Sequence, residues 1–236
     1  QAMFALYGLL GIASLFIYRR LKSGIDLTTE MATQPLAQSR RTVYKLAALF
    51  SLDSFAGGLA VQSLLALWLF QRFELSIVAA GSIFFWTGLL SALSQLAAAP
   101  LARRIGLINT MVFTHLPTNI FLVLVPFMPN LTLALIFLSL RAALSQMDVP
   151  ARSSYVMAVV TPGERAAAAS VTAVPRSLAA SASPAVAGWL LSMSAFGWPL
   201  VFCGGLKITY DLLLLYLFRR IRPPEEQAHT KTHRPV

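Results

Sequence analysis

The sequence predicts an all-α membrane protein with about seven transmembrane helices, and three observations lead to this fold class. Only 12% of the 236 residues are charged and 57% are hydrophobic, whereas about one-quarter of the residues of a soluble domain are charged. The apolar residues gather in runs of roughly 20, the length that crosses a bilayer as a helix. The segments between these runs are alternately basic and almost uncharged, a pattern typical of loops on two sides of a membrane.

Seven apolar runs are expected to span the membrane. They are expected to be helices, because backbone groups in lipid have no water to bind and must pair within the segment. The first run is short, and no cationic region precedes it as in a signal peptide. The predicted spans are 2–18, 46–70, 77–99, 107–126, 131–149, 165–191 and 199–218.

The charged loops predict the orientation of these spans, since basic loops are retained in the cytoplasm. The other connecting segments hold one Arg72–Glu74 pair or no charge at all. The alternation therefore predicts an odd number of spans in the plasma or inner membrane, with the start of the chain outside and the C-terminus cytoplasmic. The basic residues follow alternate spans: 19, 20, 22, 40, 41 and 45, then 103 and 104, then 152 and 165, then 219, 220, 222, 231 and 234.

The same pattern divides the chain into four segments. Residues 1–18 are expected to form one transmembrane helix, 19–45 a polar cytoplasmic linker, 46–218 a six-helix bundle and 219–236 a polar cytoplasmic tail. The chain opens with Gln1 directly before an apolar run. We therefore expect that an N-terminal part of the protein is missing.

Composition excludes several classes of function. The net charge of +10 does not predict nucleic-acid binding, because the basic residues lie in short clusters between apolar runs. The single cysteine, Cys203, excludes an internal disulfide. It has no metal-ligand spacing to His115, His229 or His233. We expect no metal, no cofactor and no enzymatic activity, since no phosphate loop or nucleophile motif is found.

Ionisable residues inside the predicted spans are the first candidates for function, because each is costly in a bilayer. Arg176 ranks first, since it has no carboxylate one helical turn away and must find a partner on another helix or face a water-filled cavity. Arg141 and Asp53 follow. Asp53 is a candidate to carry a coupling proton. Gln62 is weaker, because a polar residue between helices often serves only to join them.

Two pairs of charged residues have two interpretations each. Lys207 and Asp211 are four residues apart, so they share a helix face and are expected to neutralise one another rather than bind a substrate. Asp148 and Arg152 have the same spacing near a cytoplasmic boundary. They form either an ion pair at a helix end or part of a gate.

The sixth predicted span contains features of a bending helix. Pro175, Pro184 and Gly188 interrupt an Ala/Ser-rich run. Small residues permit close helix approach and prolines allow kinks. The segment is therefore either a tightly packed, kinked helix or a hinge that moves during function.

Three local motifs bear a resemblance to one family. Residues 99–106, APLARRIG, lie in a short basic loop and are similar to the Gly-x-Leu-Ala-Asp-Arg-x-Gly loop of the major facilitator superfamily, with Ala99 and Arg103 in place of Gly and Asp. Arg141 resembles the intramembrane arginine of that family's fourth-helix motif. Residues 183–188, SPAVAG, resemble the Gly-Pro-x-x-Gly-Gly stretch of its exporters.

The resemblance implies the C-terminal half of such a transporter, similar to uncharacterised efflux-type members. Its partners would be the lipid bilayer, a small solute, a possible coupling proton and a missing six-helix half. It implies alternating access, in which two bundles rock about a central polar site. On this interpretation Arg176 lines the central cavity and Arg141 lies toward its cytoplasmic side. The loop residues Arg103, Arg104 and Gly106 act with Asp148 and Arg152 in gating.

Two other functional classes fit the sequence less well. A seven-helix retinal-binding pump or sensor would use Lys207 as its Schiff-base residue, but the third span, 77–99, has no carboxylate to act as counterion. A membrane-embedded hydrolase needs a nucleophile with a base in reach. The nearest base, His115, has no clear serine partner, and an interhelical hydrogen bond is its expected role.

Overall fold

The computed structural model describes residues 8–9, 11–16 and 34–218, which form helices and turns with no strand among them. The predicted all-α membrane fold class is confirmed. The chain divides into two compact units, 1–32 and 33–236. In the first unit, residues 8–9 and 11–16 are helical. The rest of the predicted span 2–18, residues 19–33 of the predicted linker and the predicted tail 219–236 lie outside the described residues.

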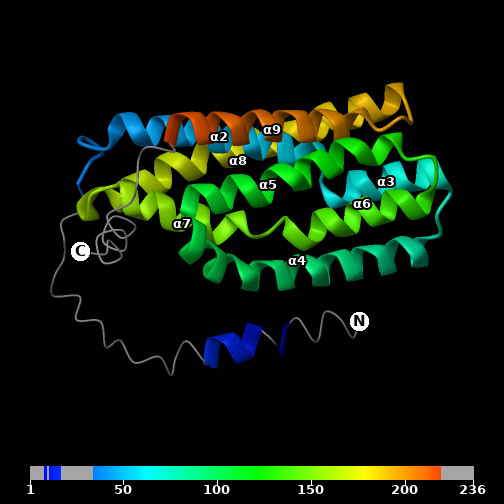
Figure 1. The fold of residues 1–236 in the computed structure, drawn as a ribbon, viewed down its shortest axis with the longest axis horizontal. Helices are drawn as coiled ribbons and strands as arrows, with labels where there is room; N and C mark the ends of the chain where they lie inside the picture. Colours follow the sequence, from blue (N-terminus) through cyan, green and yellow to red (C-terminus); the bar gives the residue numbers. More distant parts are fainter. Residues whose placement is uncertain (1–7, 10, 17–33, 219–236) are drawn as a thin grey trace, which may run out of the picture. The chain divides into compact units, whose positions relative to one another are not determined.

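The second unit is a bundle of helices that run along its length (Figure 1). Among its described residues, five stretches are long and apolar enough to cross a membrane: Arg40–Phe73, Val78–Ile105, Leu107–Phe127, Leu131–Val159 and Trp198–Phe218. The helices are α2 (Arg40–Leu59), α3 (Gln62–Phe73), α4 (Ile77–Ile105), α5 (Leu107–Leu124), η1 (Val125–Phe127), α6 (Leu131–Leu144), α7 (Asp148–Val159), η2 (Pro162–Glu164), α8 (Arg165–Met193) and α9 (Trp198–Phe218).

The sixth predicted span, 165–191, corresponds to α8, which differs from the other five in composition. Its 29 residues are enough to cross a bilayer, but its Ala- and Ser-rich sequence is less apolar than the five candidate spans. The helix runs without interruption through Pro175 and Pro184. Small side chains suit a helix that packs closely against neighbours rather than one that faces lipid along its whole length.

Two predicted spans are each divided into two helices. The span predicted at 46–70 begins earlier, at Arg40, and is interrupted at residues 60–61, where Val61 adopts an extended backbone before α3. The span predicted at 131–149 ends later. After a break at residues 145–147 it continues as α7 to Val159. Pro150 lies in the first turn of α7, where a missing N–H leaves no helical hydrogen bond unmade.

The two ends of the bundle hold different connections (Figure 1). One end holds the start of α2, the α4–α5 junction, η2 and the end of α9. The other end holds the α3–α4 and α8–α9 connections and η1. Among the described residues, Arg40 and Arg41 at the start of α2, Arg103 and Arg104 at the α4–α5 junction, and Arg165 after η2 therefore share one end of the bundle, as the charge alternation predicted. The loop position predicted for Arg152 is wrong, because this residue is buried within α7.

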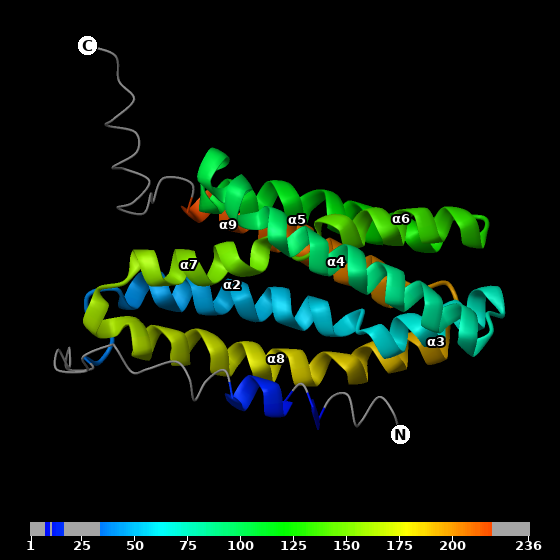
Figure 2. The ribbon, with the colours of Figure 1, turned by 90° about the horizontal axis from the view of Figure 1, so that it is seen from below.

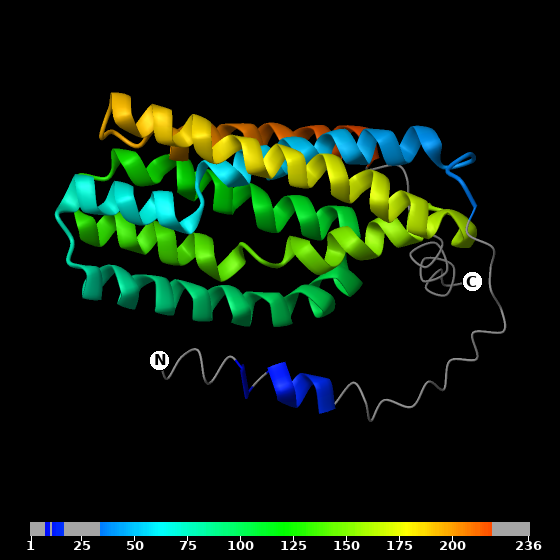
Figure 3. The same cartoon turned by 180° about the vertical axis from the view of Figure 1, so that it is seen from behind.

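Two helix pairs make the closest contacts in the bundle. α8 lies beside α2, and α5 lies beside α9 (Figures 2 and 3). Small residues allow both approaches. A Cβ atom built on Gly58 of α2 would lie 1.9 Å from Ser183 Oγ and 2.9 Å from the Ala180 carbonyl oxygen of α8. A Cβ built on Gly204 of α9 would lie 2.7 Å from the Asn119 carbonyl oxygen of α5. Only glycine permits these backbone distances.

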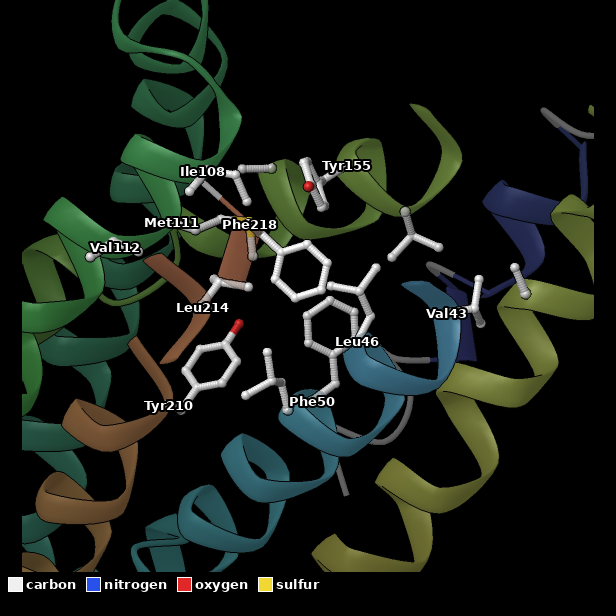
Figure 4. Packing of buried hydrophobic residues seen from close by; sticks show 14 of the residues in the cluster. Val43, Leu46, Phe50, Ile108, Met111, Val112, Tyr155, Tyr210, Leu214 and Phe218 are labelled. Atoms are coloured by element: carbon white, nitrogen blue, oxygen red, sulfur yellow. The ribbon is translucent and has the colours of Figure 1, made fainter. Parts of the chain in front are cut away.

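Two hydrophobic clusters fill the bundle, one toward each end. In the first, Phe50 of α2 packs near Tyr210 and Phe218 of α9, and Tyr155 of α7 meets Phe218 edge-on (Figure 4). The second contains Leu59, Trp68, Leu122 and the fully buried Cys203, among others. Along α2, α5 and α9 the charged and amide side chains that are buried or half-buried lie between the residues of these two clusters. The polar residues thus form a layer with apolar packing on both sides.

Glu164 ties the start of α2 to the start of α8. Its carboxylate accepts hydrogen bonds from the backbone N–H groups of Ala37, Gln38 and Ser39 at 2.7, 2.7 and 3.0 Å. Glu164 is buried. The Ser39 side chain and these backbone groups lower the pKa of Glu164 to about 2. An anionic side chain at a helix start also complements the helix dipole.

The Glu164→Gln variant is expected to have a lower melting temperature than the wild-type protein at neutral pH. A lowered pKa in the folded state contributes stability above the ordinary glutamate value near 4.5, and that contribution is lost as the pH falls toward about 2. The difference between variant and wild type is therefore expected to shrink across this window. Thermal unfolding in detergent at several pH values measures it. Glu74→Gln, at an exposed loop position, is the control, and an equal effect of both substitutions would refute the capping role.

Candidate functional site

A cluster of charged side chains occupies the polar layer of the bundle. At its centre Asp53 of α2 is only 4% exposed. Lys207 Nζ of α9 donates to Asp53 Oδ1 over 2.6 Å, and Arg152 Nη2 of α7 lies 2.9 Å from Asp53 Oδ2. One carboxylate on α2 therefore holds cations from two other helices. In a buried ion pair of this kind, the loss of one partner leaves the other charge uncompensated, which destabilises the fold.

Arg152 is fixed by further contacts. It also donates to Asp148, one turn earlier on α7. Its guanidinium lies over the rings of Phe50 and Tyr210, with centroid distances of 5.2 and 5.8 Å. Aromatic faces attract a cation electrostatically. Arg152 therefore links the polar layer to the first hydrophobic cluster.

A second buried carboxylate lies beside this cluster. Asp211 of α9 is 0% exposed. It accepts hydrogen bonds from His115 Nδ1 over 2.9 Å and from Asn119 Nδ2 over 3.0 Å, both on α5. When Asp211 is ionised its carboxylate only accepts, and the bond then requires the His115 proton on Nδ1. The other ring nitrogen, Nε2, faces Asp53 Oδ1 at 4.0 Å. His115 therefore stands between the two carboxylates.

These contacts decide between the interpretations of the charged pairs. The predicted Lys207–Asp211 pair is wrong, because Lys207 pairs with Asp53 and Asp211 pairs with α5. Residues four apart on a helix are about 40° apart around its axis, which here directs them to different neighbours. The Asp148–Arg152 ion pair is confirmed, and its role in gating stays a prediction. The interhelical hydrogen bond predicted for His115 is confirmed.

A polar pocket of about 550 Å³ opens beside this cluster. Six of the residues singled out in the sequence line it, namely Asp53, Gln62, Arg141, Asp148, Arg152 and Arg176. They come from α2, α3, α6, α7 and α8, and Lys207 of α9 and His115 of α5 complete the charged wall. Sequence positions as distant as 53 and 207 thus meet at one cavity of the size that holds small molecules.

Other predicted residues lie away from the pocket. Arg103 and Arg104 are exposed in the last turn of α4, where cations complement the negative helix end. Gly106 joins α4 to α5 with φ of 86°, a conformation that favours glycine. Pro175, Pro184 and Gly188 lie on α8 outside the pocket lining. Their roles in gating and bending stay predictions.

Sequence reasoning missed two parts of the site. Asn119 was not singled out, although it stands four residues after His115 on an apolar helix and thus on the same face. The pairing of Lys207 with Asp53 joins residues 154 positions apart, which no local spacing indicates. Within the described part of the chain, no group of three or more His, Cys, Asp or Glu side chains is placed to hold a metal ion.

Comparisons with known proteins agree with this architecture. A sequence model of the Major Facilitator Superfamily matches residues 46–235. The chain is also similar to a protein of Saccharomyces cerevisiae (strain ATCC 204508 / S288c) described as "Uncharacterized membrane protein YJR124C". The two are 27% identical over 195 residues, which are 79% of this chain and 44% of the yeast protein. The chain therefore spans about half the length of this relative.

Proposed function

Because the chain belongs to the major facilitator superfamily, we propose that the protein is a secondary active transporter of a small solute and that it works by alternating access. The observation that supports this most directly is the polar pocket, which brings charged residues of five helices, and His115 of a sixth, together inside an apolar bundle. Ionisable groups at membrane depth are costly and mark transport pathways. The solute would bind in this pocket, facing a second bundle that lies elsewhere in the full-length protein.

The direction of transport is proposed as efflux, with the plasma or inner membrane as location and a cytoplasmic C-terminus. The support is the exporter-like stretch 183–188 on α8 and the basic end of the bundle. Ser183 of this stretch lies directly against Gly58 of α2. A rocking movement between α2 and α8 would therefore change the contact between Ser183 and Gly58.

A proton is the proposed coupling ion, moving opposite to the solute as in an antiporter. Asp53 holds both Lys207 and Arg152. Protonation of Asp53 would release both cations at once, so proton binding and a rearrangement of α7 and α9 against α2 would be linked. The retinal-binding alternative for Lys207 is not favoured by the family match.

Arg176→Ala is expected to reduce transport by about tenfold or more at unchanged protein level, because an arginine contact to a bound solute is a charge-assisted hydrogen bond. The full-length protein is reconstituted in proteoliposomes and exposed to a defined mixture of small anions, sugars and amines. Mass spectrometry then identifies solutes that accumulate under an imposed proton gradient. Arg72→Ala, at an exposed position in the last turn of α3, is the matched control.

Two outcomes would count against these proposals. If no solute of the mixture moves faster than in protein-free liposomes, the transporter function is refuted. If transport proceeds but Arg176→Ala behaves like Arg72→Ala, Arg176 is removed from the site.

A further inference from the structure

The charges that line the pocket do not balance. Four cationic side chains face two carboxylates, an excess of two positive charges. His115 is neutral or adds to the positive side. The cations are Arg141, Arg152, Arg176 and Lys207, and the carboxylates are Asp53 and Asp148.

Both carboxylates are already occupied by two of these cations. Asp53 holds Lys207 and Arg152, and Asp148 holds Arg152. The other two cations, Arg141 and Arg176, have neither an ion pair nor a hydrogen bond with any residue that the structure describes. The excess charge of the pocket is therefore located on two named guanidinium groups.

The two free guanidinium groups belong to different parts of the bundle. Arg141 is half-buried on α6, which packs against α4 and α5. Arg176 is on α8, which packs mainly against α2. Both line the same pocket, so they reach it from separate helix groups. A group bound between them would be held from two directions.

We propose that this pocket binds an anionic solute through a carboxylate or phosphate group held by Arg141 and Arg176. The proposal rests on the proposed transport function and names its substrate class. A cation at membrane depth needs a partner, and guanidinium groups form paired hydrogen bonds with carboxylate and phosphate oxygens. Asn119, Gln62 and Ser91, which also line the pocket, add neutral hydrogen-bonding groups for the rest of the solute.

An equilibrium binding measurement tests this proposal independently of the transport function. The full-length protein in detergent is titrated with succinate and with inorganic phosphate, and the melting temperature is followed by intrinsic fluorescence. Two probes of the same carbon skeleton are the controls for charge: neutral succinamide and cationic 1,4-diaminobutane. We expect at least one anion to raise the melting temperature in a saturable manner, while succinamide and 1,4-diaminobutane do not.

Variants then test the two arginines. Arg141→Gln and Arg176→Gln are each expected to weaken the apparent affinity for that anion by about tenfold or more. Arg141→Lys and Arg176→Lys are expected to retain part of it, since they keep the charge but lose the planar donor pair. Arg72→Gln is expected to bind like the wild-type protein. Melting temperatures without ligand show whether each variant folds.

Each outcome has a defined meaning. If neither anion binds saturably, or if both glutamine variants bind as well as the wild type, the anion proposal is overturned. If anions bind but no solute is transported in proteoliposomes, the site stands and the transporter function fails. If solute is transported without anion binding, transport stands and the substrate class is wrong. Preference between succinate and phosphate identifies the anionic group.

Discussion

Replacing Asp53 with Asn is expected to produce the largest loss of stability and of transport among single substitutions in the site. The change removes one charge from a position that is 4% exposed and that holds two cations. Arg152 keeps Asp148, but Lys207 is left with no carboxylate among its described contacts. Breaking a buried ion pair by removing one partner costs about 3–5 kcal/mol.

The free energy of unfolding of the full-length protein, measured by denaturant titration in detergent, gives the size of the effect. The double variant Asp53→Asn/Lys207→Met is the informative comparison, because it removes the ammonium that the single variant leaves unpaired. We expect the double variant to be more stable than Asp53→Asn alone, because it no longer buries an unpaired ammonium. Equal stability of the single and double variants would show that the ammonium left without its 2.6 Å contact to Asp53 carries no energetic cost.

Transport measurements on the same variants distinguish a loss of stability from a loss of proton coupling. If Asp53 exchanges its cations for a proton, the double variant is expected to fold well and still fail to couple solute movement to a proton gradient. Exchange of solute across the membrane without a gradient would be retained. Gradient-driven accumulation by the double variant would exclude Asp53 as the proton carrier.

Replacing Gly58 with Ala is expected to give the second large effect, through packing rather than charge. The new Cβ would lie 1.9 Å from Ser183 Oγ and 2.9 Å from the backbone oxygen of Ala180. The serine is able to rotate, but the backbone oxygen moves only with α8. Overpacking of this kind costs about 1–3 kcal/mol, and it would also push α2 away from the helix with which it is proposed to move.

The adjacent glycine provides a matched control. A Cβ on Gly57 would meet only the end of the Lys207 side chain, at 3.7 Å, which is an ordinary contact. Gly57→Ala is therefore expected to be neutral or slightly stabilising, since alanine favours the helix by up to about 1 kcal/mol over glycine. Melting temperature and transport are measured for both variants. If the two alanine variants behave alike, the α2–α8 contact does not limit either property.

Much of the fold follows from local properties of the sequence. Long apolar runs predicted the helices, and the basic loops predicted which connections share one end of the bundle, as the start of α2, residues 103–104 and η2 do. The errors occur where local signals compete. The span was predicted to end at residue 149, yet α7 continues to Val159, since a proline in the first turn of a helix is tolerated. This extension carries Arg152 to Asp53.

The site was predicted in part for the same reason. Asp53, Arg141 and Arg176 were singled out because an isolated charge in an apolar run is costly, and all three line the pocket. The ion-pair partners of Asp53 could not be predicted from the sequence, because they depend on how the helices are rotated about their axes. The i,i+4 rule therefore paired Lys207 with Asp211, whereas the packed bundle pairs each with a residue on another helix.

The burial of Cys203, the only cysteine of the chain, has a practical consequence for measuring movement in this bundle. Its thiol is enclosed in the second hydrophobic cluster, so maleimide reagents will find no accessible thiol in this chain while the bundle is closed. Cysteines introduced at chosen pocket positions would therefore carry spin or fluorescent labels with little background from this native thiol. The rate of any slow labelling of Cys203 itself would report how fast α9 separates from its neighbours.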